Sequence, residues 1–150
     1  MRKALILVQD GQITDPQIAA LEAIVRRQYA AHVGGDKLLI LWNRIPAGQA
    51  FTKYEDSRSS IVTMECPNGF AQDRRVALLT ALEADWRGVT GQHADEVMLS
   101  LVDEDLFAPL FKSSQQRLSA GGRLRLLGKM VAAMLGARLR GAPIVVNPNL

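Results

Sequence analysis

Met1-Arg2-Lys3-Ala4-Leu5-Ile6-Leu7-Val8-Gln9-Asp10-Gly11 opens the chain, and this stretch decides the fold. Its apolar run from Ala4 to Val8 has the length of a strand and ends in a polar turn with a glycine. Thr14-Asp15-Pro16 then gives a helix-start signal. An apolar stripe predicts a helix of about four turns that ends at Val33-Gly34-Gly35, and Lys37 to Trp42 predicts the next strand. The stripe consists of Ile18, Leu21, Val25, Tyr29 and His32.

The same pattern recurs in the second half of the domain, at a spacing of 57 to 61 residues. Ser60 to Met64 predicts a strand, and Val97 to Val102 predicts another. Between them a helical stripe is formed by Val76, Leu79, Leu82, Glu83 and Trp86. Two βαβ units give an α/β (α+β) fold, in which right-handed crossovers place both helices on one face of a four-stranded sheet. Because the other face is then open and apolar, we expect the protein to be an oligomer.

Charge divides the 150 residues into two parts. Residues 1–111 carry 11 Lys and Arg against 15 Asp and Glu, whereas residues 112–150 carry 7 basic residues and no acidic one. We therefore predict a tandem βαβ domain over 1–105 and a basic extension over 106–150, with a helix from about Gly122 to Arg140 and a short final strand at Ile144–Val146. The extension is predicted to pack its Leu and Met stripe on the sheet or on a neighbouring subunit. Membrane and nucleic-acid binding are disfavoured, because no aromatic residue follows Phe111 to anchor or stack.

Other features of the sequence limit the classes of function. No apolar run is long enough to cross a bilayer, and neither a secretory signal nor a second cysteine beside Cys66 is present, which indicates a reducing cytoplasm. Two scattered histidines give no metal site, and no Gly-rich phosphate loop or Ser/His/Asp arrangement occurs. We expect no cofactor and no metal.

Several short motifs resemble the tautomerase superfamily, whose members are trimers with a catalytic amino-terminal proline. They are Gln9-Asp10, Pro46-Ala47-Gly48 followed by Phe51, and Pro67-Asn68-Gly69-Phe70, which are similar to the cis-3-chloroacrylic acid dehalogenase group. Arg58-Ser59-Ser60 is similar to malonate semialdehyde decarboxylase. The resemblance covers about residues 1 to 105 and implies a homotrimer that takes a small carboxylate or keto acid.

The residues that the resemblance makes catalytic are replaced in this chain. Arg2 stands where the proline should follow Met1, or Met1 itself does if the Gln9-Asp10 match fixes the register without a gap. A bulky Arg2 predicts that Met1 is retained with a primary amine. Pro67 and Phe70 stand where that group uses two arginines to hold a carboxylate. A helix histidine and a strand tyrosine of the group fall at Gln28 and Leu101.

The topology predicts where a site lies, because the first strand should begin where the third and fourth strands end. The candidate catalytic residues are Met1, Arg2, Lys3, Asp103 and Glu104, and the candidate pocket residues are Gln28, Cys66, Pro67, Phe70 and Leu101. The first hypothesis is a protein without proline-dependent tautomerase, dehalogenase or decarboxylase activity. The second is an enzyme of altered mechanism that uses the Met1 amine or Lys3 with Asp103 or Glu104 on a small keto or unsaturated acid. The third is a non-enzymatic binding or scaffold protein that acts through the basic extension.

Overall fold

The computed structural model describes residues 1–35, 37–109 and 120–146. Its elements, in chain order, are β1 (Arg2–Gln9), α1 (Asp15–His32), β2 (Leu38–Ile45), β3 (Phe51–Thr52), β4 (Glu55–Asp56), β5 (Ser60–Cys66), α2 (Gln72–Thr90), the 3-10 helix η1 (Ala94–Glu96), β6 (Val97–Asp103), α4 (Ala120–Arg140) and β7 (Val145–Val146). Residues 104–109 are also helical.

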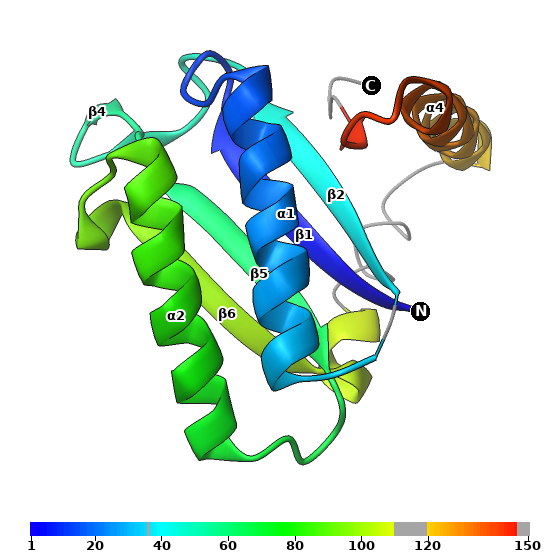
Figure 1. Ribbon diagram of the computed structural model, residues 1–150. Helices are drawn as coiled ribbons and strands as arrows, with labels where there is room; N and C mark the ends of the chain where they lie inside the picture. Colours follow the sequence, from blue (N-terminus) through cyan, green and yellow to red (C-terminus); the bar gives the residue numbers. More distant parts are fainter. Residues whose placement is uncertain (36, 110–119, 147–150) are drawn as a thin grey trace.

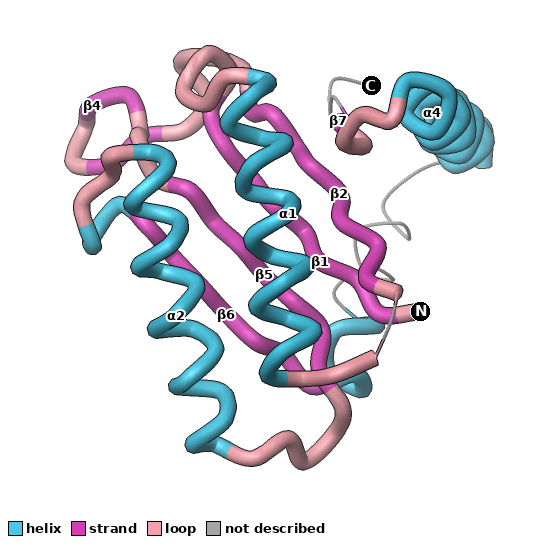
Figure 2. Tube along the Cα trace, in the orientation of Figure 1, coloured by secondary structure: helices cyan, strands magenta, loops and turns pink. Residues whose placement is uncertain are grey.

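Five strands form the main sheet in the order β6-β5-β1-β2-β7, with α1 and α2 side by side on one of its faces (Figure 1). β1 pairs in parallel with β2 and antiparallel with β5, and β5 pairs in parallel with β6. The two βαβ units, their four-stranded sheet and the two helices on one face are thereby confirmed. β7 adds a short fifth strand beside β2, as Ile144–Val146 suggested. The small β3–β4 hairpin lies outside the main sheet (Figure 2) and was not predicted.

The core lies between the sheet and the two helices. Alternate residues of β1 (Ala4, Ile6 and Val8) are buried, as a strand with one covered face requires. Trp42 of β2 and Trp86 of α2 stack at its centre, with ring centroids 6.0 Å apart. The sequence-derived helical stripe of α1 is confirmed for Ile18, Leu21, Val25 and Tyr29, which are all buried, whereas His32 is only half-buried.

The predicted stripe of α2 is partly wrong. Leu82 and Trp86 are buried as expected, but Leu78 fills the first core position and Val76 is 53% exposed. Buried residues of α2 advance in steps of four, so Val76, two residues before Leu78, points toward solvent.

α4 lies beyond the β2 edge of the sheet, next to β7 (Figure 1). The helix predicted for residues 122–140 is thus present. Most of the large apolar side chains described on α4 are exposed; they are Leu124, Leu127, Val131, Leu135 and Leu139. None of the helices in the described parts of the chain has the length and apolar character that a membrane crossing needs.

Candidate functional site

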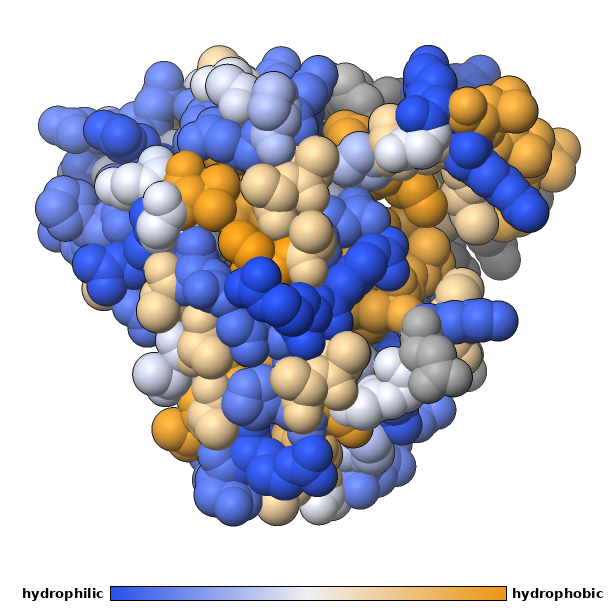
Figure 3. Space-filling model, viewed as in Figure 1, coloured by the Kyte–Doolittle hydropathy of each residue, from blue (hydrophilic) through white to orange (hydrophobic). Residues whose placement is uncertain are grey.

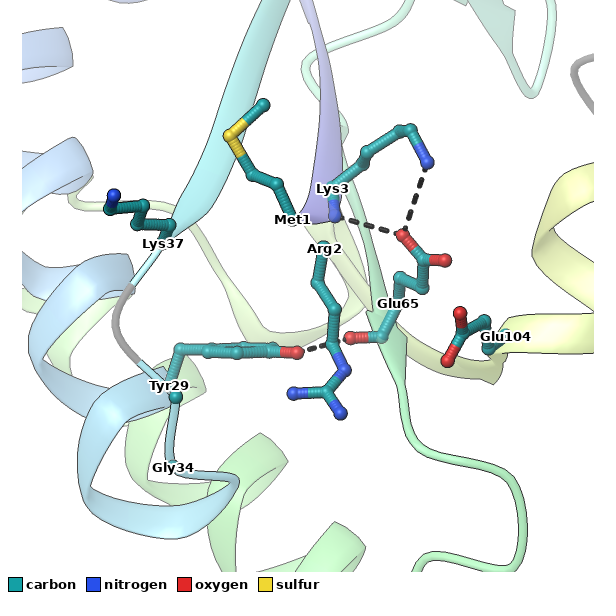
Figure 4. Close-up of a pocket in the computed structure, with 9 residues that line it drawn as sticks. Met1, Arg2, Lys3, Tyr29, Gly34, Lys37, Glu65 and Glu104 are labelled. Atoms are coloured by element: carbon teal, nitrogen blue, oxygen red, sulfur yellow. Dashed lines mark hydrogen bonds and ion pairs between the residues drawn. The ribbon is translucent and has the colours of Figure 1, made fainter.

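A cavity of about 660 Å³ opens at the corner of the sheet where β1 begins and β5 ends. The antiparallel register of these strands brings the start of the chain to Glu65. The turn after α1, with Gly34 and Gly35, forms another side of the cavity. The residues that line the cavity are Met1, Arg2, Lys3, Tyr29, Gly34, Gly35, Lys37, Glu65 and Glu104 (Figure 4). Cationic side chains outnumber the two carboxylates, so the cavity suits an anionic ligand.

Glu65, at the end of β5, holds the start of β1 in place. Its carboxylate Oε2 accepts a hydrogen bond from the Lys3 backbone nitrogen at 2.9 Å and lies 3.5 Å from Lys3 Nζ. The side chain is buried, so this paired carboxylate needs those donors. Lys3 is therefore held by Glu65.

Tyr29 joins α1 to the same strand. Its hydroxyl donates a hydrogen bond of 2.5 Å to the Glu65 carbonyl oxygen. Burial raises the pKa of Tyr29 to about 12, although the neighbouring Arg2 guanidinium acts in the opposite direction. The phenol therefore stays protonated at neutral pH and acts as a donor.

The Arg2 side chain runs past the Tyr29 hydroxyl toward the turn after α1 (Figure 4). Its Nε is buried and has no hydrogen-bond partner among the described residues. Gly35 has a φ of +87°, and a β-carbon built on it would lie 3.3 Å from Arg2 Nη1. This glycine therefore serves both the left-handed turn and the close approach of the guanidinium.

The predicted site residues divide into two groups. Met1, Arg2, Lys3 and Glu104 line the cavity together. Asp103 does not, because it pairs with Arg75 of α2 and accepts a hydrogen bond from the Cys66 thiol at 3.5 Å. The Arg75 bond holds the pKa of Asp103 below its ordinary value.

The predicted pocket residues are not among the cavity-lining set. Leu101 and Phe70 offer carbonyl oxygens to Arg75, at 3.0 and 2.8 Å, and the Phe70 ring lies under Arg74 and Arg75. Burial, followed by the bond to Asp103, raises the pKa of Cys66 to about 11, so this thiol is a poor nucleophile. Pro67 shapes the turn that leads to Phe70, whose nitrogen bonds to the Pro67 oxygen.

Gln28 has a structural contact instead of a place in the cavity. Its Nε2 donates to Asp85 Oδ2 of α2 at 2.6 Å, and this hydrogen bond lowers the pKa of Asp85. It ties α1 to α2 on the outer side of the helices.

Tyr29, Glu65, the Gly34–Gly35 turn and Lys37 were missed by the sequence-based site prediction. Glu65 did carry a usable signal: it is an acidic residue directly after an apolar strand, at the sheet end where the first strand starts. Tyr29 gave no such signal, because its position fits a core stripe equally well. In the described parts of the chain, no group of three or more His, Cys, Asp or Glu side chains could hold a metal.

Comparisons with known proteins bear on the fold. No protein-family model matches the chain, and no curated protein matches it. Solved structures do match. Native Ps01740 is 22% identical with a TM-score of 0.64, over 67% of this chain and 92% of that one. The fused 4-OT symmetric trimer is 16% identical with a TM-score of 0.60, over 67% and 84%.

A third match is N1, a member of the cis-3-chloroacrylic acid dehalogenase family. It is 13% identical with a TM-score of 0.60, over 67% of this chain and 73% of that one. The chain therefore has the fold of the tautomerase superfamily, as the sequence motifs indicated.

Proposed function

We propose that this protein binds a small carboxylate or keto acid in the cavity at the start of β1, and that it lacks proline-dependent tautomerase, dehalogenase and decarboxylase activity. The observation that carries the proposal is the Arg2 guanidinium, which reaches the cavity with a buried, unpartnered Nε. Guanidinium groups present a planar set of donors that matches a carboxylate. A carboxylate bound in the cavity would pair with this cation.

The expected lack of proline chemistry rests on the residues that surround the cavity. Its nine lining residues include no proline, and the first proline in the sequence is Pro16. An assay with phenylenolpyruvate and 3-haloacrylates tests this part. We expect no turnover above the buffer background. Turnover comparable to that of a proline-bearing relative would refute it.

Calorimetric titration with pyruvate and with acrylate tests the binding. Arg2→Gln should weaken the affinity by roughly 10-fold or more, because a hydrogen bond to a charged group contributes about 1.5–3 kcal/mol. Arg58→Gln is the matched control, since Arg58 lies at the other end of the sheet with an 80% exposed side chain and pairs with Glu96. Equal affinity of the Arg2→Gln variant and the wild type would show that Arg2 does not hold the ligand.

A second candidate function is catalysis by an altered mechanism. Met1 and Glu104 line the same cavity, so the Met1 amine and a carboxylate could act on one keto acid. Lys3 and Asp103 are less suited, since they are held by Glu65 and Arg75. Intact mass establishes whether Met1 is retained, and borohydride trapping with a keto acid, read by peptide mass, locates any imine. No adduct across a panel of keto acids would refute this mechanism.

We also propose a homotrimer. The fold supports it, because matched structures are described as a symmetric trimer and as asymmetric trimers of fused 4-OT. Light scattering should give three times the single-chain mass of 16.4 kDa.

The cytoplasmic location suggested by the lone Cys66 stays a prediction.

A further inference from the structure

α4 differs from an ordinary amphipathic helix in the side chains that it turns toward its own domain. The small residues Ala133, Gly136 and Ala137 are on its inner side: Ala137 is only 4% exposed, and the other two are half-buried. Its larger apolar residues are exposed: Leu124 is 74% exposed and Val131 is 53% exposed. The outward stripe consists of Leu124, Leu127, Val131 and Leu139, whereas Met134 and Leu135 line a pocket with Glu22 and Arg26 of α1. Orange, hydrophobic side chains gather on α4 at the upper right of Figure 3.

Such a stripe normally packs against another surface. Residues 124, 127 and 131 are separated by steps of three and four, so they follow one side of the helix. At 21 residues, α4 can present this side over about 31 Å.

A second exposed apolar side chain lies at the far edge of the sheet. β6 is the edge strand there, and its Met98 is 57% exposed. Because Val97 is buried in the core, its neighbour Met98 points to the sheet face opposite α1 and α2. Its cross-strand neighbour Ile61 is on the same face.

Acidic residues flank β6 at both ends. Asp95 and Glu96 precede the strand, and Glu104 and Asp105 follow it. α4 carries the opposite charge, with five Lys and Arg and no acidic residue between 120 and 140. The β6 edge, with Met98 between acidic residues, is therefore complementary to α4, whose apolar stripe lies among basic residues.

These two surfaces cannot meet within one chain. α4 contacts β7 at one edge of the sheet, and β5, β1 and β2 separate β7 from β6 at the other edge. We propose that the α4 stripe of one copy packs on the β6 edge of the next copy, at and around Met98. Contacts between opposite edges are head-to-tail, and such contacts close into a ring when the rotation permits. This inference rests on the homotrimer proposed above.

Two alternative occupants of the stripe fit less well. Two α4 helices packed on each other would bring five basic residues against five, with no acidic residue in either helix. An anionic membrane would match the charge, but it would leave Met98 and the acidic β6 edge uncovered.

Crosslinking of the full chain tests the contact. The double variant Val131→Cys/Met98→Cys is treated with a short bismaleimide, and the products are read by mass after denaturation. We expect covalent dimers and a closed ring, because each chain would be joined to the next. The native Cys66 is buried and contributes only background.

The matched control is Val131→Cys/Val76→Cys. Val76 is an equally exposed valine, at 53%, but it lies on α2 on the opposite side of the sheet. This control variant should give no crosslinked dimers or rings. Equal amounts of crosslinked product from both double variants would overturn the proposed contact and indicate random collision. Dimers from Val131→Cys alone that stop at two chains would also overturn it and indicate α4–α4 pairing.

A charge in the stripe gives an independent measurement. Val131→Glu should lower the mass in light scattering from the oligomer to the single chain, whereas Val76→Glu should leave it unchanged. Circular dichroism checks that both variants are folded. An unchanged oligomer in Val131→Glu overturns the inference and leaves the trimer standing. Binding of the wild type to phosphatidylserine vesicles, lost in Val131→Glu without a change in mass, would assign the stripe to lipid instead.

Discussion

The Asp103 carboxylate lies beside the Arg75 guanidinium, which holds its pKa below the ordinary value. A lowered folded pKa stabilises the protein above the unfolded pKa of about 3.9, and this contribution is lost as the pH falls through the folded pKa. Asp103→Asn should therefore lower the Tm at pH 7. The difference from the wild type should shrink as the pH falls below about 4. Melting curves across pH measure both effects.

Asp105→Asn serves as the control for this pH series. It is the same change two residues away, on an exposed side chain. Its Tm should follow that of the wild type at every pH. A constant difference between Asp103→Asn and the wild type, independent of pH, would show that the carboxylate charge is not the source of the stabilisation.

At the scale of residues, four of the nine cavity-lining residues (Met1, Arg2, Lys3 and Glu104) were among the candidates named from the sequence. Met1, Arg2 and Lys3 were placed correctly near the ends of β5 and β6, because strand direction alone determines that proximity. The partners of Lys3 and Asp103 were not predictable, since a side chain pairs with whichever opposite charge lies within reach. Arg75 reaches Asp103 from a helix 28 residues earlier in the chain.

Core positions of α2 give a prediction at the scale of elements. Leu78→Ala should lower the free energy of unfolding by about 2–5 kcal/mol, because it removes a fully buried side chain and leaves a cavity. Val76→Ala should change it by less than about 0.5 kcal/mol, because Val76 is exposed. Urea unfolding followed by Trp fluorescence measures both. Equal costs would contradict the observed orientation of α2.

Element types were predicted more successfully than helix orientation. The strands and helices of both βαβ units follow from apolar periodicity and from helix-start signals such as Thr14, whose backbone nitrogen donates to Gln17 Oε1 at 3.0 Å. The buried side of α2 was harder, since its sequence offers apolar residues at 76, 78, 79 and 82 on more than one side of the helix. Tertiary packing selected among them.

Truncation gives a prediction at the scale of the whole molecule. A chain that ends at residue 111 keeps both βαβ units and loses α4 and β7. We expect it to retain the emission of the stacked Trp42 and Trp86 and the cavity at β1, while its mass falls to that of a single chain. Fluorescence, calorimetric titration and light scattering check these outcomes. An unfolded product would mean that residues 112–150 belong to the same folding unit.

The turn at Gly35 has a consequence for the symmetry of the two halves. The interval that relates Gly34 to Gly91 also relates Tyr29 to Trp86 and Gly35 to Gln92. At the second corner, Gln92 is buried, accepts hydrogen bonds from Ser60 Oγ at 2.9 Å and Trp86 Nε1 at 3.0 Å, and donates to the Arg58 oxygen at 2.5 Å.

The two βαβ units thus differ at the turn that follows each helix. In the first unit Gly35 leaves room for the Arg2 guanidinium, whereas in the second the Gln92 amide fills the equivalent position with its hydrogen bonds. The first unit therefore carries the cavity-lining glycine turn, and the second carries a buried glutamine that is hydrogen-bonded on three sides.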